Sequence, residues 1–273
     1  METKMESRTV RALTYRPGKL LSVKEKLIEE VPLEIIINGS QRILIMHTPL
    51  MSYELVHGFL YTDGYVSDAE EITRCEISSK EYPDGGLFVE AAVTTKQIAK
   101  KKEAAAPDRI SYSSCGICGR EELEEMSRGL GRIKSRQHFS MEILMEISEK
   151  MRNYQPLYRK TRAAHAALLF DADGNFVIGA EDVGRHNAID KAIGTCMLKE
   201  IPTHDKVVVS SGRASLEMVL KAVRGGFPLF VAMSRPTFRA VEAAKFYNLT
   251  LVDLARDTNR IYSHARRIKE YQD

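Results

Sequence analysis

The sequence predicts a three-layer α/β domain that follows a smaller α+β domain, and two features of the residue pattern support this class. From position 165 onward, short apolar runs such as Val207-Val208-Val209 alternate with segments of helical spacing, as in strands that helices cover on both faces. Between positions 9 and 93, extended segments dominate and one helical segment interrupts them. We expect segment limits of 1–106 for the α+β domain, 107–160 for a cysteine loop with a helical connector, and 161–273 for the α/β domain.

The expected N-terminal domain has strands at 9–15, 33–37, 43–46, 72–77 and 87–93. Asn38-Gly39 predicts a hairpin turn, because both residues tolerate a positive φ. Thr48 and Pro49 predict the start of a helix, as an N-cap followed by a first-turn proline, and Gly64 predicts its end.

The connector is expected to hold a charged stretch at 96–108, the cysteine loop, and helices at 121–129 and 141–154. The α/β domain opens with a predicted hairpin of strands at 165–170 and 177–180. Further strands are expected at 206–210, 229–233 and 250–255, and helices at 185–198, 215–224 and 237–247.

Two of the four cysteines lie three residues apart, Cys115 and Cys118, in a Ser/Gly-rich stretch at 111–119. Thiols on such a loop can form a disulfide, bind half of a metal site or carry a sulfur atom. Cys75 and Cys196 fall in predicted strand or helix, so we expect them to be small buried hydrophobic residues. The chemistry to explain therefore belongs to Cys115 and Cys118.

Two other interpretations of this cysteine pair remain open at this point. A structural zinc site needs four ligands, usually as two close pairs, and the sequence has no second CxxC and no HxxxH pair. A dithiol oxidoreductase would place the pair at the N-terminus of a helix, and the segment at 121–129 is a candidate. Zinc is therefore disfavoured, whereas a thiol-disulfide oxidoreductase stays as the alternative function.

Four predicted turns that follow strands each contain an arginine, namely Arg185, Arg213, Arg235 and Arg256. In an open α/β sheet, ligands bind in the crevice beyond the carboxyl ends of the strands. The planar guanidinium pairs with two phosphate oxygens at once, so the repetition predicts a phosphate-rich ligand. The alternative is that each arginine caps a surface turn or pairs with a nearby acid, such as Asp257.

Two histidines accompany these turns. His186 lies one helical turn before Asp190, whose carboxylate could hold the second ring nitrogen of the imidazole. The pair is either a proton carrier or a structural contact. His165 opens an apolar strand and is either functional or a hydrogen-bonded core histidine.

Composition sets outer limits on the class of function. The chain is 44% hydrophobic and 28% charged, which is typical of an ordinary globular protein. Its net charge of +3 is too small to indicate that it binds nucleic acid. No window approaches the roughly 18 consecutive apolar residues of a membrane span, and positions 1–11 lack the apolar segment of a signal peptide. We therefore expect no nucleic-acid partner, no membrane span and a cytosolic location.

Three motifs together resemble the formate dehydrogenase accessory sulfurtransferase family, FdhD. They are Ser-Cys-Gly-Ile-Cys-Gly at 114–119, Glu-Asp-Val-Gly-Arg-His-Asn-Ala-Ile-Asp-Lys-Ala-Ile-Gly at 181–194, and Ser-Gly-Arg-Ala-Ser-Leu-Glu-Met-Val-Leu-Lys-Ala at 211–222. The resemblance implies a cytosolic sulfur carrier and a homodimer. It also implies a cytidine-deaminase-like carboxyl-terminal domain that lacks the zinc ligands of the deaminases.

The resemblance further implies the direction of sulfur transfer. A cysteine desulfurase would load Cys115 with persulfide sulfur, and Cys118 would be a second relay thiol or would help to release the first sulfur. The acceptor would be the client cofactor Mo-bis(molybdopterin guanine dinucleotide), or its tungsten form, before insertion into formate dehydrogenase. The arginine turns, with His186, would bind the pyrophosphates, and the family's cofactor-binding stretch corresponds to Leu254, Ala255, Arg256, Asp257, Thr258 and Asn259.

Three stretches depart from the usual pattern of that family. Arg162 and Ala163 stand where the family has glycines, and Arg235 replaces an alanine. The stretch at 254–259 lacks the family's glycine and its second arginine, unless Arg260 takes the place of the latter. These departures bear on cofactor affinity, on the metal and on the formate dehydrogenase that is served. Sulfur transfer is less affected, because both loop cysteines are present.

Overall fold

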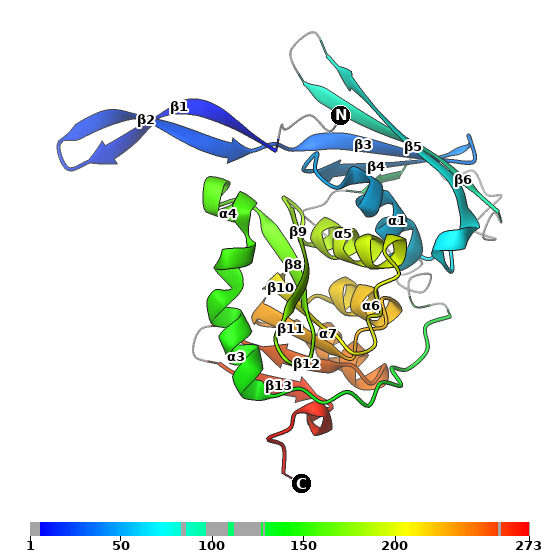
Figure 1. The fold of residues 1–273 in the computed structure, drawn as a ribbon. Helices are drawn as coiled ribbons and strands as arrows, with labels where there is room; N and C mark the ends of the chain where they lie inside the picture. The colour runs from blue at the N-terminus through cyan, green and yellow to red at the C-terminus, as the bar shows by residue number, and fades with distance from the viewer. Residues whose placement is uncertain are drawn as a thin grey trace.

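The computed structural model describes residues 6–82, 86–96, 109–111, 127, 129–255 and 258–272. It contains a six-stranded sheet, a five-stranded sheet and a separate two-stranded hairpin (Figure 1). Each of the two larger sheets has its own buried apolar cluster. The mixed α/β class expected from the sequence is therefore confirmed.

The six-stranded sheet has the strand order β13-β12-β11-β10-β8-β9. β10, β11 and β12 run parallel, β8 is antiparallel to β10, and β9 is antiparallel to β8. The carboxyl ends of β9, β10, β11 and β12 therefore lie at the same edge of the sheet. The strands are β8 (His165–Phe170), β9 (Phe176–Asp182), β10 (Val207–Arg213), β11 (Leu229–Ser234), β12 (Thr250–Asp253) and β13 (Arg260–Ser263).

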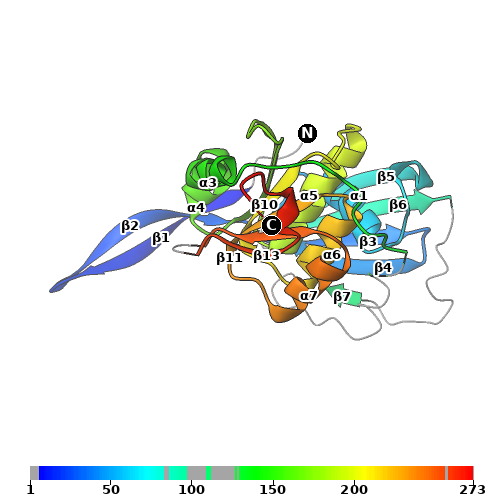
Figure 2. The ribbon, with the colours of Figure 1, turned by 90° about the horizontal axis from the view of Figure 1, so that it is seen from below.

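Helices cover both faces of this sheet (Figures 1 and 2). One face carries α5 (Arg185–Leu198), α6 (Leu216–Arg224) and α7 (Phe238–Phe246), and the other carries α3 (Met141–Lys150), η2 (Met151–Tyr154) and α4 (Pro156–Thr161). Alternate strand residues pack toward opposite faces, because successive side chains of a strand point in opposite directions. Leu169 and Val208 join the cluster under α5 to α7, whereas Leu168 and Val209 join the cluster under α3.

The five-stranded sheet has the order β5-β6-β3-β4-β7, and α1 (Ser52–Thr62) covers one of its faces. The turn between β3 and β4 is the one predicted from Asn38-Gly39, since both residues have a positive φ, of 48° and 71°. The strands are β3 (Val31–Ile37), β4 (Gln41–His47), β5 (Ile72–Glu81), β6 (Leu87–Thr95) and β7 (Arg109–Ser111), and η1 (Ala69–Glu71) precedes β5.

Several local predictions were wrong or incomplete. Helix α1 begins at Ser52 and not at Thr48, because both the backbone N–H and the hydroxyl of Thr48 are bonded to the end of β9 and cannot cap a helix. Strand β2 (Lys19–Ile28), which pairs with β1 (Ser7–Arg16) through a Pro17-Gly18 turn, was not predicted from the sequence. Nor were α4, β13 and η3 (Ala265–Arg267).

Helices α1 and α5 bring the two larger sheets together through direct backbone contact. A Cβ atom added at Gly58 would lie 1.8 Å from the carbonyl oxygen of Asp190, and one added at Gly194 would lie 1.9 Å from that of Glu54. Real Cβ atoms do not approach backbone oxygens so closely. Only glycine at these two positions therefore allows the helices to cross at this separation.

A buried polar cluster fixes the same interface. The carboxylate of Asp182 accepts hydrogen bonds from Thr48 N (3.1 Å) and from Asn187 Nδ2 (2.9 Å), and it pairs with Lys191 Nζ at 2.5 Å. Lys191 also donates to the carbonyl of Thr48, and Asn187 donates to that of Met46. Because neither member of the ion pair is exposed to solvent, each depends on these partners for its solvation.

A second buried cluster is centred on Asp190 of α5. Lys221 Nζ donates to both carboxylate oxygens of Asp190 at 2.9 Å, and to Thr62 and Asp63 at 2.8 Å. Burial by itself would lower the pKa of Lys221, but the carboxylates of Asp190 and Asp63 raise it above its ordinary value. The ammonium is therefore charged and joins α6 to the end of α1.

The glycine crossing predicts a large loss of stability on a minimal substitution. Gly194→Ala forces α1 and α5 apart, so we expect the free energy of unfolding in urea to fall by about 3 kcal/mol. Gly131→Ala is the matched control, because a Cβ at Gly131 meets no atom within 4 Å. Equal stability of the two variants would contradict the crossing described above.

Buried His47 predicts acid sensitivity. Its Nδ1 lies 3.1 Å from the carbonyl of Val31, its Nε2 lies 2.9 Å from the hydroxyl of Ser52, and burial, reinforced by nearby Lys191, lowers its pKa from 6.5 to about 4. Between pH 6.5 and 4, His47 is protonated in the unfolded chain but stays neutral in the folded protein. The stability from this group is therefore present above pH 6.5 and lost as the pH falls, by about 3 kcal/mol in total.

The measurement is the free energy of unfolding in urea as a function of pH. We expect His47→Asn to have a lower stability at pH 7 and a shallower decline between pH 6.5 and 4 than the unmodified protein. Parallel declines for the two proteins would show that another group dominates the acid response.

Candidate functional site

Three of the four predicted arginine turns lie at one edge of the six-stranded sheet. Arg185 follows β9, Arg213 ends β10 and Arg235 follows β11, and these strands share their direction. The side chains of Arg213 and Arg235 are exposed, whereas that of Arg185 is half-buried. This edge therefore presents guanidinium groups from three consecutive turns, which are the groups that recognise phosphate and carboxylate oxygens.

Four of the predicted site residues, Cys115, Cys118, Arg256 and Asp257, lie outside the residues that the structure describes.

The described residues of the stretch at 254–259 form a turn after β12. Leu254 is buried in the cluster under α3, and Ala255 N donates to the carboxylate of Asp253 at 2.7 Å. The Thr258 hydroxyl donates to the Ala255 carbonyl at 2.8 Å, and Asn259 has a positive φ of 40°. The backbone turns back on itself here, at the same sheet edge as the arginines.

A compact group of polar residues lies where β8, β9 and β10 meet. The Nδ1 atom of His165 is 3.3 Å from the hydroxyl of Ser211, which also accepts a hydrogen bond from Ala166 N at 2.9 Å. A Cβ atom at Gly212 would lie 3.1 Å from Cδ of Arg185 and 3.5 Å from His165 Nδ1. Gly212 thus lets the end of β10 pass close to both side chains.

The electrostatic surroundings keep His165 neutral. Burial, followed by the positive charge of Arg185 and then by His186, lowers the pKa of His165 below its ordinary value. At neutral pH the ring therefore carries one proton and can both donate and accept a hydrogen bond. His165 was weighed in the sequence as either functional or a core histidine, and the structure places it half-buried beside the arginine edge.

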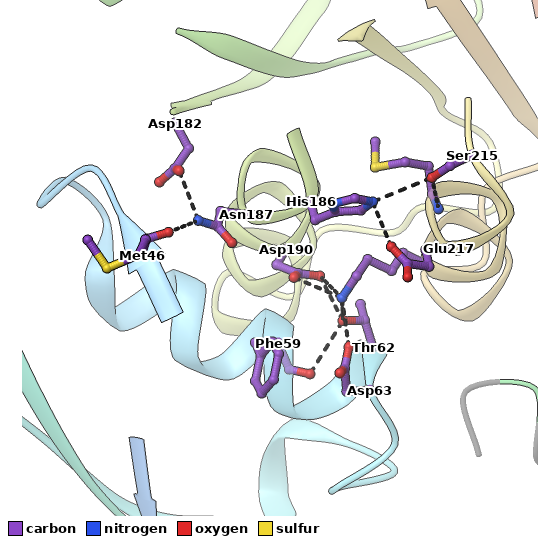
Figure 3. A network of polar contacts seen from close by, with 12 residues as sticks. Met46, Phe59, Thr62, Asp63, Asp182, His186, Asn187, Asp190, Ser215 and Glu217 are labelled. Atoms are coloured by element: carbon purple, nitrogen blue, oxygen red, sulfur yellow. Dashed lines mark hydrogen bonds and ion pairs between the residues drawn. The ribbon is translucent and has the colours of Figure 1, made fainter. Parts of the chain in front are cut away.

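His186 is oriented by a carboxylate, but not by the one predicted. Figure 3 shows its Nε2 directed toward Glu217 Oε2, at 2.9 Å, and toward the hydroxyl of Ser215, at 3.4 Å. The expected contact with Asp190 is wrong, because that carboxylate binds Thr62 and Lys221 in the second buried cluster. A side chain from α6, distant in the sequence, therefore replaces the neighbour one turn away.

The motif at 181–194 contributes more to the assembly of the fold than the sequence analysis anticipated. Glu181 accepts hydrogen bonds from the backbone of Leu157 (2.7 Å) and Tyr158 (2.8 Å) at the start of α4. Besides Gly194 at the helix crossing, five polar members of the motif are structural, and these are Glu181, Asp182, Asn187, Asp190 and Lys191. A usable signal was the placement of polar residues and a glycine at helical spacing on one face of α5, which indicates a close polar interface.

Arg162, one of the departures from the FdhD pattern, keeps the backbone conformation that a glycine would favour. It has φ 61° and ψ 13° at the end of α4, and its N–H donates to the carbonyl of Tyr158 at 2.8 Å. Its guanidinium lies over the Tyr158 ring, 5.8 Å from the centroid. The left-handed turn is therefore retained with a side chain present, at a cost of about 1 kcal/mol.

The two described cysteines are poor nucleophiles. Cys196 is buried in α5 and Cys75 is half-buried on β5, and burial raises the pKa of each thiol to about 12. Both are protonated at neutral pH, and the thiolate is the reactive form. Of the four cysteines, Cys115 and Cys118 therefore stay the predicted candidates for thiolate chemistry.

The described residues also bear on two other kinds of site. They contain no group of three or more His, Cys, Asp and Glu side chains arranged to hold a metal ion. Within the same residues, no helix has the length and apolar character needed to cross a membrane.

Comparisons with known proteins match nearly the whole chain. The model of the FdhD/NarQ family matches residues 28–269. The sulfur carrier protein FdhD of Thermoplasma acidophilum is 34% identical over 98% of this chain and 95% of its own, and that of Sulfolobus acidocaldarius is 32% identical over 97% and 99%.

A solved structure matches the fold. A crystal structure from Desulfotalea psychrophila, described as that of a proposed formate dehydrogenase accessory protein, has a TM-score of 0.74 and 24% identity. The match covers 96% of this chain and 99% of the other. The match to the family model and the identities above 30% show that this chain belongs to the FdhD/NarQ family.

Proposed function

We propose that this protein is a sulfur carrier required for formate dehydrogenase activity. In this role it receives persulfide sulfur from a cysteine desulfurase and transfers it to Mo-bis(molybdopterin guanine dinucleotide) before that cofactor is inserted into formate dehydrogenase. The observation that carries the proposal is the near full-length match to sulfur carrier proteins of the FdhD type. The Cys115-Gly-Ile-Cys118 motif supplies the thiols that such a carrier needs.

The loading step is a thiol exchange. The thiolate of Cys115 attacks the outer sulfur of the desulfurase persulfide, the S–S bond of the donor breaks, and the donor cysteine leaves as a thiolate. Cys115 then carries the persulfide. Cys118 can attack the inner sulfur of Cys115, which expels hydrosulfide and leaves a Cys115–Cys118 disulfide for a cellular dithiol to reduce.

The arginine edge supports the proposed acceptor. Arg185, Arg213 and Arg235 present donor forks that match the pyrophosphate oxygens of a guanine dinucleotide. Neutral His165 and the oriented ring of His186 add hydrogen-bonding groups beside Arg185. The proposed binding residues are these side chains together with Leu254, Ala255, Arg256, Asp257, Thr258 and Asn259. The metal of the cofactor is the sulfur acceptor and thus belongs to the substrate.

We extend the proposal to a homodimer in the cytoplasm, on the basis of the resemblance to the FdhD family. The described residues contain no membrane-spanning helix.

Persulfide loading is tested by intact-mass spectrometry after incubation with a cysteine desulfurase and cysteine. We expect an added mass of one sulfur atom that dithiothreitol removes and that Cys115→Ala abolishes, because Cys115 is the proposed acceptor thiol. Cys75→Ala is the control and should load fully, since its protonated thiol takes no part. An adduct that survives in the Cys115→Ala variant would overturn the assignment.

Cofactor binding is tested with guanosine diphosphate as the probe, by isothermal titration calorimetry. We expect Arg213→Ala and Arg235→Ala each to weaken binding by about tenfold, the loss typical of one hydrogen bond to a charged group. Arg74→Ala is the matched control, because Arg74 is an exposed arginine on β5 of the other sheet.

The same titration separates the proposal from its alternative. A thiol-disulfide oxidoreductase would cycle the Cys115–Cys118 disulfide with a protein substrate and would have no requirement for a guanine nucleotide. Unchanged affinity in both edge variants, or no binding by the unmodified protein, would count against the acceptor site.

A further inference from the structure

The hairpin of β1 and β2 stands apart from both larger sheets. Its strands pair over ten residues each, from Ser7↔Ile28 to Arg16↔Lys19, and form a two-stranded sheet of their own. Figures 1 and 2 both show it extending away from the rest of the molecule. The base is fixed by an ion pair between Lys160 and Glu6 and by the contact of β2 with α4. Isolated two-stranded hairpins are at best marginally stable in water, so contact with a partner molecule would stabilise this projecting hairpin.

One face of this hairpin, which we call the arm face, carries an exposed apolar cluster. Leu13, Tyr15 and Leu20 are 66%, 71% and 63% exposed. Tyr15 lies directly opposite Leu20, and Leu13 lies diagonally across from it, so the three side chains share one face near the tip. Clustered exposed apolar residues of this kind mark interaction sites, and tyrosine is prominent among the residues that dominate binding energy.

Basic residues surround the cluster. The hairpin has six basic residues and one acidic residue, which gives it a net charge of +5, whereas the whole chain has +3. The rest of the chain therefore sums to −2. Arg11 lies directly opposite Lys24 on the arm face, and Arg16 lies directly opposite Lys19 on the other face.

These opposed charges have an energetic cost within the hairpin. Like charges directly opposite each other destabilise a pair of strands, and this pair receives little support from the rest of the chain. Among the ion pairs of the described residues, none involves Arg11 or Lys24. A partner that places carboxylates against the arm face would relieve the repulsion, which favours an acidic partner surface.

The same features disfavour other kinds of occupant. A bilayer would leave the open edges of the hairpin without hydrogen-bond partners, and nucleic acid would leave Leu13 and Leu20 against phosphates. In a symmetric contact of the arm face with its own copy, Arg11 and Lys24 would meet the same basic residues. A protein with an acidic rim around an apolar recess satisfies both the charges and the cluster.

We propose that the arm face docks the cysteine desulfurase that loads the carrier, through an acidic surface of that enzyme. This inference rests on the proposed function. In the proposed function, the arginine edge of the six-stranded sheet binds the cofactor. The loading step requires contact with a protein, the cysteine desulfurase that donates the sulfur. The docking brings the donor to the carrier, and the basic arm accelerates and orients the encounter.

Two matched pairs of variants test the inference, with the full-length protein and the purified cysteine desulfurase of the same organism. Lys24→Glu on the arm face and Lys19→Glu on the opposite face both convert a like-charged cross-strand pair into an attractive one, so the hairpin is preserved in each. Tyr15→Ala on the arm face is matched by Val10→Ala, whose side chain is 37% exposed on the opposite face.

By calorimetric titration we expect Tyr15→Ala to weaken desulfurase binding by about tenfold and Lys24→Glu by about fivefold, with both controls within about twofold of the unmodified protein. Binding should also weaken as salt is added, and less steeply for Lys24→Glu. Equal affinities for the arm-face and control variants would overturn the inference. The inference would also be overturned if the arm-face variants bound the desulfurase normally and were weakened only in another interaction. Those interactions are self-association measured by sedimentation, binding of anionic vesicles and binding of formate dehydrogenase.

Loading with inorganic polysulfide separates this inference from the proposed function. A small donor needs no docking surface, so the arm-face variants should acquire the Cys115 adduct from polysulfide at the unmodified level and acquire it more slowly from limiting desulfurase. If Cys115 accepts sulfur from neither donor, sulfur transfer itself is refuted. If the variants load from desulfurase at the unmodified rate, the arm has no part in loading, although the carrier function stands.

Discussion

The close crossing of α1 and α5 positions the two larger sheets and the first turn of α5. Gly58 and Gly194 let two helical backbones touch, so the distance between the two larger sheets is fixed by hard contact. The buried pair of Asp182 and Lys191 then satisfies the polar groups around that contact. Leaving either ion without its partner would cost about 3–5 kcal/mol. Both ions also bond to the backbone of Thr48, just after β4, and these bonds tie the five-stranded sheet to the six-stranded one.

The same helix joins this interface to the candidate site. The first turn of α5 carries Arg185 and His186, and its inward face carries Asn187, Asp190 and Lys191. Because the buried hydrogen bonds and ion pairs of the inward face hold α5 in place, the first turn of the helix has a defined position at the carboxyl end of β9. One short motif therefore serves two purposes, one on each side of the helix.

Charge is distributed unevenly over the molecule, and the small net charge conceals this. Arginines gather at the carboxyl edge of the large sheet, and a net charge of +5 lies on the hairpin of β1 and β2. The edge offers guanidinium groups that suit phosphate oxygens, whereas the arm suits an extended acidic surface. The proposed function gives each cationic surface its own ligand, with the cofactor at the edge and the desulfurase at the arm.

The alternation of strands and helices after His165, the Asn38-Gly39 turn and the arginines at strand ends could be predicted from the sequence. Each of these features depends on local periodicity or on the backbone preferences of adjacent residues. By contrast, the packing of distant elements makes Thr48 bond to Asp182, 134 residues away, so that it does not cap α1. The same kind of packing makes Glu217, and not Asp190, orient His186. Each of these side chains has several possible hydrogen-bond partners in the sequence. The partner that it binds depends on which helices and strands pack together, and a local sequence pattern contains no information about that packing.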